Sequence, residues 1–431
     1  MSIRTKLTLV TLSGLIAIYA IVGGMLSSTS FGHVMANSGP YPQLSIFSEV
    51  VRHIVTDYVE KPDLNKVRIG ALRGLTDALD PYSAYLLPQQ VKEYQAKTQT
   101  DATGLIIGSI RGYAYVISVV PNSPAAKAGV KARDFIEYID GHATHDIDLV
   151  DAYSLLSGAL GSQVEVAYQR SGVRGNEKVK ITRGPVTAPK PELQALEQQI
   201  GYVKVQSLPG QAEAVQASIR EAIKRGANKI ILDLRGSAGD DLQAGVEVAN
   251  YFLKSGTIAK VIGRKEKVIT TYEAKPEKTL TDLPLAIITD YSTAGAAEIV
   301  AAAILDNKRG EVIGERTFGI GSEQKLFPID DGSAFLLTVA RYASPNGKFF
   351  LPEGVTPSVE VKRKDVADAS ALDELDPDAS PAPTTTPNPS DKDKANKPVT
   401  QAAPQKPAED LLLKKAIEVL TTADKAKKKS A

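Results

Sequence analysis

Histidine and cysteine, which often carry nucleophilic and metal chemistry, are scarce in this chain of 431 residues. Cysteine is absent, and this excludes disulfides, thiolate metal sites and a cysteine nucleophile. The four histidines are His33, His53, His142 and His145, and all of them precede residue 190. A Ser-His-Asp triad in the second half of the chain would therefore need a histidine from another domain.

Serine, threonine and aspartate are the remaining candidates for chemistry in the second half of the chain. Ser292 and Thr293 precede a predicted helix and are typical of helix capping, although Ser292 could also be a nucleophile. Asp233, Asp240 and Asp241 could be combined into a metal cluster. The simpler interpretation is that Asp233 lies on a strand and that the other two are solvated acids at a helix start, where the helix dipole favours them. We therefore predict no metal site.

The overall charge of the chain is almost balanced, with Lys+Arg 51 against Asp+Glu 50 and a formal net charge of +1. Because there is no basic excess to bind a phosphate backbone, nucleic acid is not an expected partner. Hydrophobic residues make up 43% of the chain, an ordinary value for a globular protein. The length suggests about three domain-sized pieces.

The N-terminal segment predicts export. Arg4 and Lys6 precede an uncharged run from residue 7 to residue 26, the order of a secretory signal or a membrane anchor. The run is just long enough to span a bilayer, while Val34-Met35-Ala36 offers a cleavage site. We favour an uncleaved anchor within residues 1–36 over a cleaved signal peptide, with a buried helix of a soluble protein as a further alternative. The expected location is extracytoplasmic, in a bacterial periplasm or an equivalent compartment.

Residues 41–90 have the apolar spacing of two helices. The apolar residues recur at three- and four-residue steps and are Leu44, Phe47, Val51, Ile54 and Tyr58, then Ile69, Leu72 and Leu75. We predict a helical hairpin that ends at Asp80-Pro81, since the residue before a proline disfavours the helical conformation.

Residues 95–184 predict a compact β-rich module. Short β-rich runs occur at 115–120, 135–139, 164–168 and 179–182, with one helical stretch at 149–160. The run Pro-Asn-Ser-Pro-Ala-Ala-Lys-Ala-Gly-Val at 121–130, with Arg-Asp-Phe-Ile at 133–136 and Ile-Asp-Gly at 139–141, resembles the PDZ domains of exported proteases. The resemblance implies a glycine-containing loop whose N–H groups bind a peptide carboxylate while the peptide adds a strand to the sheet edge.

The corresponding loop in this chain consists of Gly104, Leu105, Ile106 and Ile107, which become the candidate peptide-binding residues. Ile106 replaces the second glycine of the family pattern, and a β-branched residue is disfavoured at positive φ. We therefore expect weak carboxylate capture but a hydrophobic groove that binds polypeptide segments or C-termini. The alternative is a module used only for internal docking.

Residues 190–363 predict an α/β domain with a mixed sheet, because apolar strand runs alternate with helical patterns. The expected strands are 202–207, 229–234, 285–289 and 312–313, and the expected helices are 212–223, 241–253 and 294–305. Asp331-Gly332 between two apolar runs indicates a hairpin, so antiparallel strands should close the sheet at one end.

The C-terminal segment changes in composition after residue 364. Residues 365–407 hold eight of the chain's 25 prolines, and we predict a disordered linker there. Residues 408–431 predict a final helix followed by a cationic tail, which we expect to be solvated; binding to anionic lipid is the alternative. The helix has a narrow apolar stripe formed by Leu413, Ala416, Ile417 and Leu420.

The order of these segments resembles the carboxyl-terminal processing peptidases, also called tail-specific proteases. The resemblance covers about residues 41–363. It rests on the PDZ-like module and on the sequences Leu-Asp-Pro at 79–81, Ile-Leu-Asp-Leu-Arg-Gly at 231–236 and Gly-Glu-Arg-Thr-Phe-Gly at 314–319. Members of this family are exported or lumenal serine endopeptidases that cleave proteins near their C-termini with a Ser-Lys dyad assisted by a Gln. No cofactor is implied.

The positions that the resemblance assigns to the dyad do not hold catalytic residue types. The family serine, three residues before a Glu-Ile pair, falls on Gly295, and the family lysine, between two glycines, falls on Ile320. The separation of the two positions equals that of the family dyad, so no gap explains the mismatch. Gln324 is retained. Because glycine has no side chain to attack with and isoleucine accepts no proton, the inherited mechanism cannot operate.

Three further residues do not restore the family mechanism. Asp240 and Asp241 replace a glycine-rich continuation that would help to form an oxyanion hole, and carboxylates would repel an oxyanion. Lys325 is expected to point away from the site, since strand neighbours face opposite sides. The leading hypothesis is a membrane-anchored pseudopeptidase that binds polypeptides or partner proteins. The alternatives are an active serine endopeptidase with a displaced nucleophile such as Ser292, and a structural subunit that holds an active relative.

Overall fold

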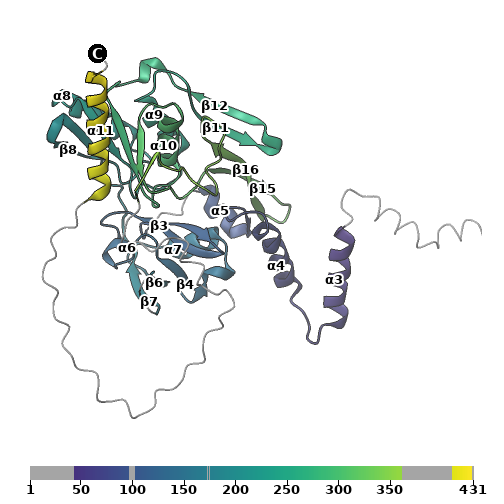
Figure 1. The fold of residues 1–431 in the computed structure, drawn as a ribbon. Coiled ribbons are helices and arrows are strands. Elements are labelled where there is room, and N and C mark those ends of the chain that lie inside the picture. Colours follow the sequence, from purple (N-terminus) through teal and green to yellow (C-terminus); the bar gives the residue numbers. More distant parts are fainter. Residues whose placement is uncertain (1–42, 97–101, 172, 174, 362–409, 430–431) are drawn as a thin grey trace, which may run out of the picture. The chain divides into compact units, whose positions relative to one another are not determined.

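The structure is a computed structural model that describes residues 43–96, 102–171, 173, 175–361 and 410–429 (Figure 1). The predicted anchor at 1–36 and the predicted linker at 365–407 lie outside the described residues. In the described part of the chain, no helix has both the length and the apolar character needed to cross a membrane. The chain divides into two compact units, one ending at Leu72 and the other beginning at Arg73.

The N-terminal unit contains helix α3 (Gln43–Asp57) and most of helix α4 (Leu64–Asp77), at the positions where two helices were predicted. The predicted all-helical segment is interrupted further on, because strand β1 (Ala84–Leu86) precedes helix α5 (Pro88–Ala96). Both of these elements belong to the second unit, in which the side chains of β1 are fully buried and the strand pairs with β16. That long-range pairing cannot be read from local periodicity.

The PDZ-like module forms a six-stranded antiparallel sheet in the order β2-β3-β4-β6-β7, with β5 paired to β4. Its strands are β2 (Leu105–Ile110), β3 (Tyr113–Val119), β4 (Phe135–Ile139), β5 (His142–Ala143), β6 (Gln163–Gln169) and β7 (Glu177–Thr182). Its helices are α6 (Pro124–Lys127) and α7 (Leu149–Leu156). Strand β2 lies at the edge of this sheet, so one side of its backbone pairs with no strand in the described part of the chain.

The α/β core contains a second six-stranded sheet in the order β17-β14-β13-β10-β9-β8. The strands are parallel except at the β8–β9 pair. They are β8 (Glu192–Leu196), β9 (Ile200–Lys204), β10 (Lys229–Asp233), β13 (Leu285–Thr289), β14 (Glu311–Gly314) and β17 (Val359–Glu360). The predicted strand at 285–289 is confirmed at both ends.

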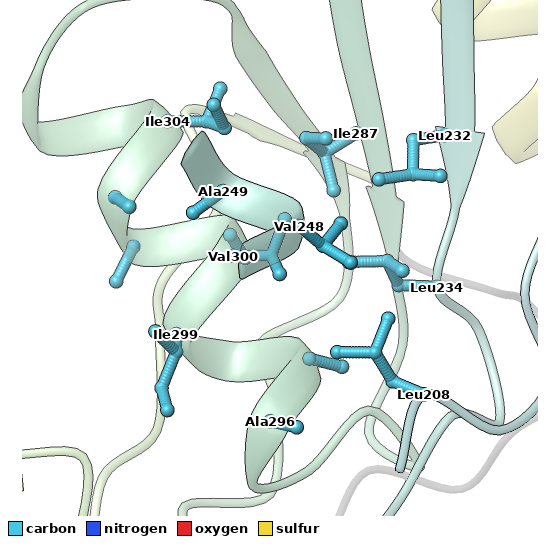
Figure 2. Packing of buried hydrophobic residues seen from close by; sticks show 14 of the residues in the cluster. Leu208, Leu232, Leu234, Val248, Ala249, Ile287, Ala296, Ile299, Val300 and Ile304 are labelled. Atoms are coloured by element: carbon cyan, nitrogen blue, oxygen red, sulfur yellow. The ribbon is translucent and has the colours of Figure 1, made fainter. Parts of the chain in front are cut away.

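Helices cover both faces of this sheet (Figure 1). One face packs against α8 (Ala212–Lys224), α9 (Leu242–Asn250) and α10 (Ala296–Asp306), where Val248, Val300 and Ile304 meet Leu232 and Ile287 (Figure 2). The other face packs against the terminal helix α11 (Leu411–Lys429). The predicted stripe on α11 is confirmed: Ala416 and Leu420 are buried against Ile200, Tyr202 and Ile231, joined by Leu412.

The predicted hairpin at Asp331-Gly332 joins β15 (Ser322–Pro328) to β16 (Ala334–Ala343). However, it does not close the parallel sheet. It belongs to a separate antiparallel sheet with β1, β11 (Thr257–Gly263) and β12 (Val268–Glu273). The reason is the length of β16, which pairs with β1 near its start, with β11 near its end and with β15 over most of its length. Within the described sheets, β16 pairs with no strand of the parallel sheet.

Candidate functional site

Three loops meet beyond the carboxyl ends of the adjacent parallel strands β10, β13 and β14, the edge at which α/β sheets place their sites. Backbone hydrogen bonds join the loops directly. Ala294 N–H donates to Ser237 O at 2.9 Å and Ala296 N–H donates to Gly239 O at 3.0 Å, while Phe318 N–H donates to Thr293 O at 3.0 Å. Both predicted dyad positions lie in this junction.

Gly295 lies in the sharp turn between β13 and α10, with φ 64° and ψ −118°. A strained strand-to-helix turn of this kind is also how α/β hydrolases present a nucleophile. Here the turn is closed against the neighbouring loop. A Cβ atom at residue 295 would lie 2.3 Å from the carbonyl oxygen of Gly239 and 2.9 Å from its carbonyl carbon. No side chain fits at this position unless the backbone at residue 239 moves.

Glu298 joins the two dyad positions through its carboxylate. Oε2 accepts hydrogen bonds from Gly295 N–H and Ile320 N–H, each at 2.8 Å. Oε1 accepts from Gly319 N–H at 2.8 Å and from the Thr317 hydroxyl. The side chain is fully buried, and this burial raises its pKa to about 7, although the four hydrogen bonds act in the opposite direction. The buried carboxylate thus fixes the turn at Gly295 to the loop at Ile320.

Ile320 is half-buried and packs against an apolar cluster. The cluster combines residues of the core with residues of the PDZ-like module, namely Ala238, Ala294 and Phe318 with Ile106, Tyr115 and Ile117. The environment of Ile320 is therefore apolar and includes residues of β2 and β3 of the PDZ-like module.

Polar and aromatic contacts hold the PDZ-like module on the same loops. The rings of Tyr115 and Phe318 are stacked with centroids 5.8 Å apart, and the Ser118 hydroxyl donates to Gly236 O at 2.6 Å. Arg133 forms an ion pair with Glu315. The module is thus docked directly over the junction that carries Gly295 and Ile320.

Sequence comparisons agree with this architecture. The family model described as peptidase family S41 matches residues 199–361, and a PDZ domain model matches residues 115–170. The carboxy-terminal-processing protease of Bartonella bacilliformis is 31% identical over 363 residues, covering 80% of this chain and 82% of that protein. The chain belongs to the carboxy-terminal processing protease family.

Other members of this family give a consistent result. The carboxy-terminal processing protease CtpA of Bacillus subtilis is 29% identical over 83% of this chain and 78% of its own length. Among solved structures, a photosystem II D1 C-terminal processing protease matches with a TM-score of 0.64 at 29% identity, covering 76% of this chain and 88% of that one. The mixed α/β fold with a PDZ domain is therefore shared.

The predicted capping role of Ser292 and Thr293 is wrong. Helix α10 has Gly295 at its N-cap, and Glu298 supplies the capping interaction from the third helical position. The Thr293 hydroxyl instead donates to Leu234 O at 3.0 Å and thereby connects the loop after β13 to the loop after β10. A glutamate three residues after a glycine at a helix start was the signal that could have revealed the role of Glu298.

The three aspartates have separate roles. Asp233 is buried and accepts hydrogen bonds from Arg235 and from the Tyr202 hydroxyl. Asp241 caps α9 by accepting from Ala244 N–H at 2.9 Å, which confirms its predicted place at a helix start. Among the described residues, no group of three or more His, Cys, Asp or Glu is arranged to hold a metal ion.

Asp240 keeps a negative charge at the site. The pKa of the Asp240 carboxyl is raised to about 6, first by loss of hydration and then by the like charges of Asp241 and Glu323. The residue is nevertheless exposed to solvent. At neutral pH the carboxylate is therefore ionised. A negative charge at this position would oppose the formation of an oxyanion nearby.

Gln324 is part of a chain of polar hydrogen bonds. Its amide donates to Ser322 Oγ at 2.8 Å and to Thr338 Oγ1 at 3.3 Å, and the Thr338 hydroxyl donates to Asp80 at 3.0 Å. Lys325 is exposed with its ammonium group over the ring of Phe327, so it points away from the site as predicted.

The predicted peptide-binding loop differs from expectation in two respects. Ile106 lies within β2 and is not among the described residues with positive φ, so the expected steric penalty does not arise. The side chains of Leu105 and Ile107 are each only 2% exposed in the core of the PDZ domain, and Ile106 packs toward Phe318. These side chains therefore do not line an open groove in this structure, because helix α7 closes over them. Gly104 has φ 80°, where glycine is favoured.

Proposed function

We propose that this chain is a catalytically inactive member of the carboxy-terminal processing protease family that binds polypeptides or partner proteins outside the cytoplasm. The observation that carries the proposal is the closed turn at Gly295. A Cβ atom there would lie 2.3 Å from a backbone oxygen, so the missing serine is not a simple replacement within an open catalytic site. Ile320 supplies no base, and the space around it is occupied by apolar side chains of the PDZ domain.

Other groups near the junction are poorly suited to replace the dyad. The Glu298 carboxylate accepts four hydrogen bonds and would have to give up some of them to act as a base. Ser292 is 5% exposed, and its N–H donates to Asp290 Oδ1 within the loop. These contacts favour a structural role for the loop over an alternative catalytic one.

A serine-reactive fluorophosphonate probe tests the inactive state. We expect no labelling of the purified protein and no cleavage of an unstructured substrate such as casein, with an active family member as the positive control. Labelling of the wild-type chain that disappears in Ser292→Ala would establish the alternative, an active endopeptidase with a displaced nucleophile.

The binding role is supported by the family's PDZ domain, which retains the strand edge used for polypeptide addition. Pull-down of the full-length protein from detergent-solubilised membranes would identify its partners. Recovery of peptide ligands or unrelated proteins supports this role, whereas recovery of an active family member alone would favour the structural-subunit alternative.

The proposed membrane location rests on the uncharged run at residues 7–26. We expect the full-length chain to remain in the membrane pellet after extraction with alkaline carbonate, and a chain beginning at Tyr41 to be soluble. Release of the full-length chain by carbonate would contradict an anchor, and a protein shortened by about 36 residues would indicate cleavage near Ala36.

A further inference from the structure

The free edge of β2 is covered by one side chain of helix α7. Ile107 N–H donates to the Tyr153 hydroxyl at 3.0 Å, and the same hydroxyl donates to Ile107 O at 2.9 Å. An added polypeptide strand would use these same two backbone groups, because a residue opposite an edge strand exchanges an N–H and a C=O with it. Tyr153 therefore occupies the central pairing position of the edge.

The remaining groups of this edge define how far a strand could extend. Outward-facing backbone groups alternate along a strand, so Leu105 and Ser109 face the same edge as Ile107. A ligand whose terminal carboxylate lies at the Gly104 loop must run antiparallel to β2. Its last residue then lies opposite Leu105, and the fourth residue before it lies opposite Ser109.

The two ends of this edge have different surroundings. Around Leu105 and Ile107 the space is closed and apolar, as described above. Beyond Tyr153, an open cavity of about 360 Å³ is bordered by Ser109 of β2 and by Leu149 and Ala152 of α7. The cavity therefore continues the line of β2 and α7 past the position that Tyr153 covers.

The charge of the open cavity is predominantly negative. Asp77, Asp80, Asp146 and Asp148 line it together with His145. Asp80 accepts hydrogen bonds from the 82–83 segment and from Thr338. No lysine or arginine is among the lining residues of the cavity, and Arg73 is paired with Asp151. A basic side chain of a ligand strand, opposite Ser109, would enter this cavity.

We propose that the Tyr153 hydroxyl closes the β2 edge in the free protein, and that the segment which displaces it is an extended polypeptide C-terminus with an apolar last residue and a Lys or Arg four positions before it. This inference rests on the proposed binding function and adds the ligand's chemical class. Affinity for such a segment is reduced by the fraction of molecules in which Tyr153 is in place.

The test measures the contact and the ligand separately. In Tyr153→Phe the ring remains and the hydroxyl is lost, so we expect the Ile107 amide to exchange with solvent at least tenfold faster by hydrogen-exchange NMR. Tyr138→Phe is the matched control, since Tyr138 is 45% exposed on β4 of the same domain. Unchanged exchange at Ile107 in Tyr153→Phe would overturn the closed-edge proposal.

Fluorescence polarisation with labelled decapeptides tests the ligand. The peptides end in valine and carry Lys, Ala or Glu at the fourth position before the end. We expect Lys to bind at least fivefold more tightly than Glu at low salt, with the difference reduced in 0.5 M NaCl and in Asp146→Asn. Tyr153→Phe should bind the Lys peptide about five- to tenfold more tightly than the wild type, because no hydroxyl has to be displaced.

The outcomes separate the two proposals. Equal affinity of the wild type and Tyr153→Phe overturns the displacement of Tyr153, and equal affinity for the Lys, Ala and Glu peptides overturns the assigned ligand class. If neither protein binds any peptide, the proposed polypeptide-binding function of this groove fails, while the exchange rate of Ile107 still decides whether Tyr153 closes the edge.

Discussion

At the scale of single residues, the closed turn at Gly295 leads us to predict that substituting the two dyad positions will not produce catalysis. Gly295→Ser should destabilise the fold by at least about 2 kcal/mol, because the new Cβ meets the Gly239 carbonyl in addition to requiring positive φ. Adding Ile320→Lys should still give no cleavage of casein, since a lysine buried without a partner is costly. Urea denaturation and a gel-based cleavage assay measure the two effects.

Gly236→Ser is a matched control for this loss of stability. Gly236 has φ 72° in a neighbouring loop, but no atom lies within 4 Å of its ideal Cβ position. Gly236→Ser therefore has the energetic cost of positive φ but no steric conflict. The difference in the free energy of unfolding between the two variants gives the cost of the conflict with Gly239. Equal losses of stability in both variants would mean that the turn at Gly295 has room for a side chain.

Glu298 predicts a specific dependence of stability on pH. Its pKa in the folded protein is about 7, above the value of about 4.3 expected for an unfolded chain, so the folded state holds the proton more tightly. The stabilisation linked to this proton is complete below about pH 4 and is lost as the pH rises to about 7. It should amount to roughly 2 to 4 kcal/mol across this range.

The variant Glu298→Gln removes this titration. Comparison of urea unfolding for the wild type and Glu298→Gln between pH 4.5 and 8 isolates it from the contributions of other acids. We expect the variant to be less stable, because an amide cannot accept all four hydrogen bonds, and to show a smaller fall in stability with rising pH. Parallel curves for the two proteins would contradict the raised pKa.

The sequence was sufficient to predict which residues lie at this site but not the contacts that they make. The residue types at Gly295 and Ile320 and the retained Gln324 were readable from motifs and spacing. The conflict with Gly239 and the bonds of Glu298 were not, because they arise only when loops from three strands meet. The roles of Ser292 and Thr293 were misjudged for the same reason.

At the scale of elements, the terminal helix α11 is part of the hydrophobic core, because its apolar side chains pack against the parallel sheet. Leu412 is 2% exposed against the parallel sheet, whereas its neighbour Leu411 is 48% exposed. We expect Leu412→Ala to lower the free energy of unfolding by about 2 to 4 kcal/mol and Leu411→Ala to change it by less than about 0.5 kcal/mol. Chemical denaturation of the two variants measures the contrast, and similar values would mean that α11 does not pack as described.

An ion pair also holds the start of α11. Arg235 donates to both oxygens of Asp410, at 2.9 and 2.7 Å, and also binds the buried Asp233.

The apolar stripe of helix α11 was predictable from its period, and so were strands such as Phe135–Ile139 whose β-rich runs are bounded by turns. Strands β1 and β2 were missed, because their positions depend on pairing partners and on the packing of α7.

At the scale of the whole described assembly of PDZ domain and core, the junction couples the PDZ domain to the loops that carry Gly295 and Ile320. The rings of Phe318, Tyr115 of β3 and Tyr291 of the core all contact one another. The centroid of Phe318 lies 5.8 Å from that of Tyr115 and 5.5 Å from that of Tyr291, and the two tyrosine centroids are 6.2 Å apart. Arg133 adds an ion pair to Glu315 and lies over the Tyr291 ring at 5.6 Å. These contacts are concentrated in one place, so we expect the cooperativity of unfolding to depend on them.

Phe318→Ala tests this coupling. Removal of a ring buried between the two domains should cost about 3 kcal/mol or more, and the loss should fall on their docking rather than on either core. We therefore expect one calorimetric transition in the wild type and two in the variant, with the PDZ domain unfolding first because its core is the smaller. Phe327→Ala, at a side chain that is 39% exposed, is the control and should keep a single transition. A single transition in Phe318→Ala as well would show that the domains are held together by contacts outside this aromatic cluster.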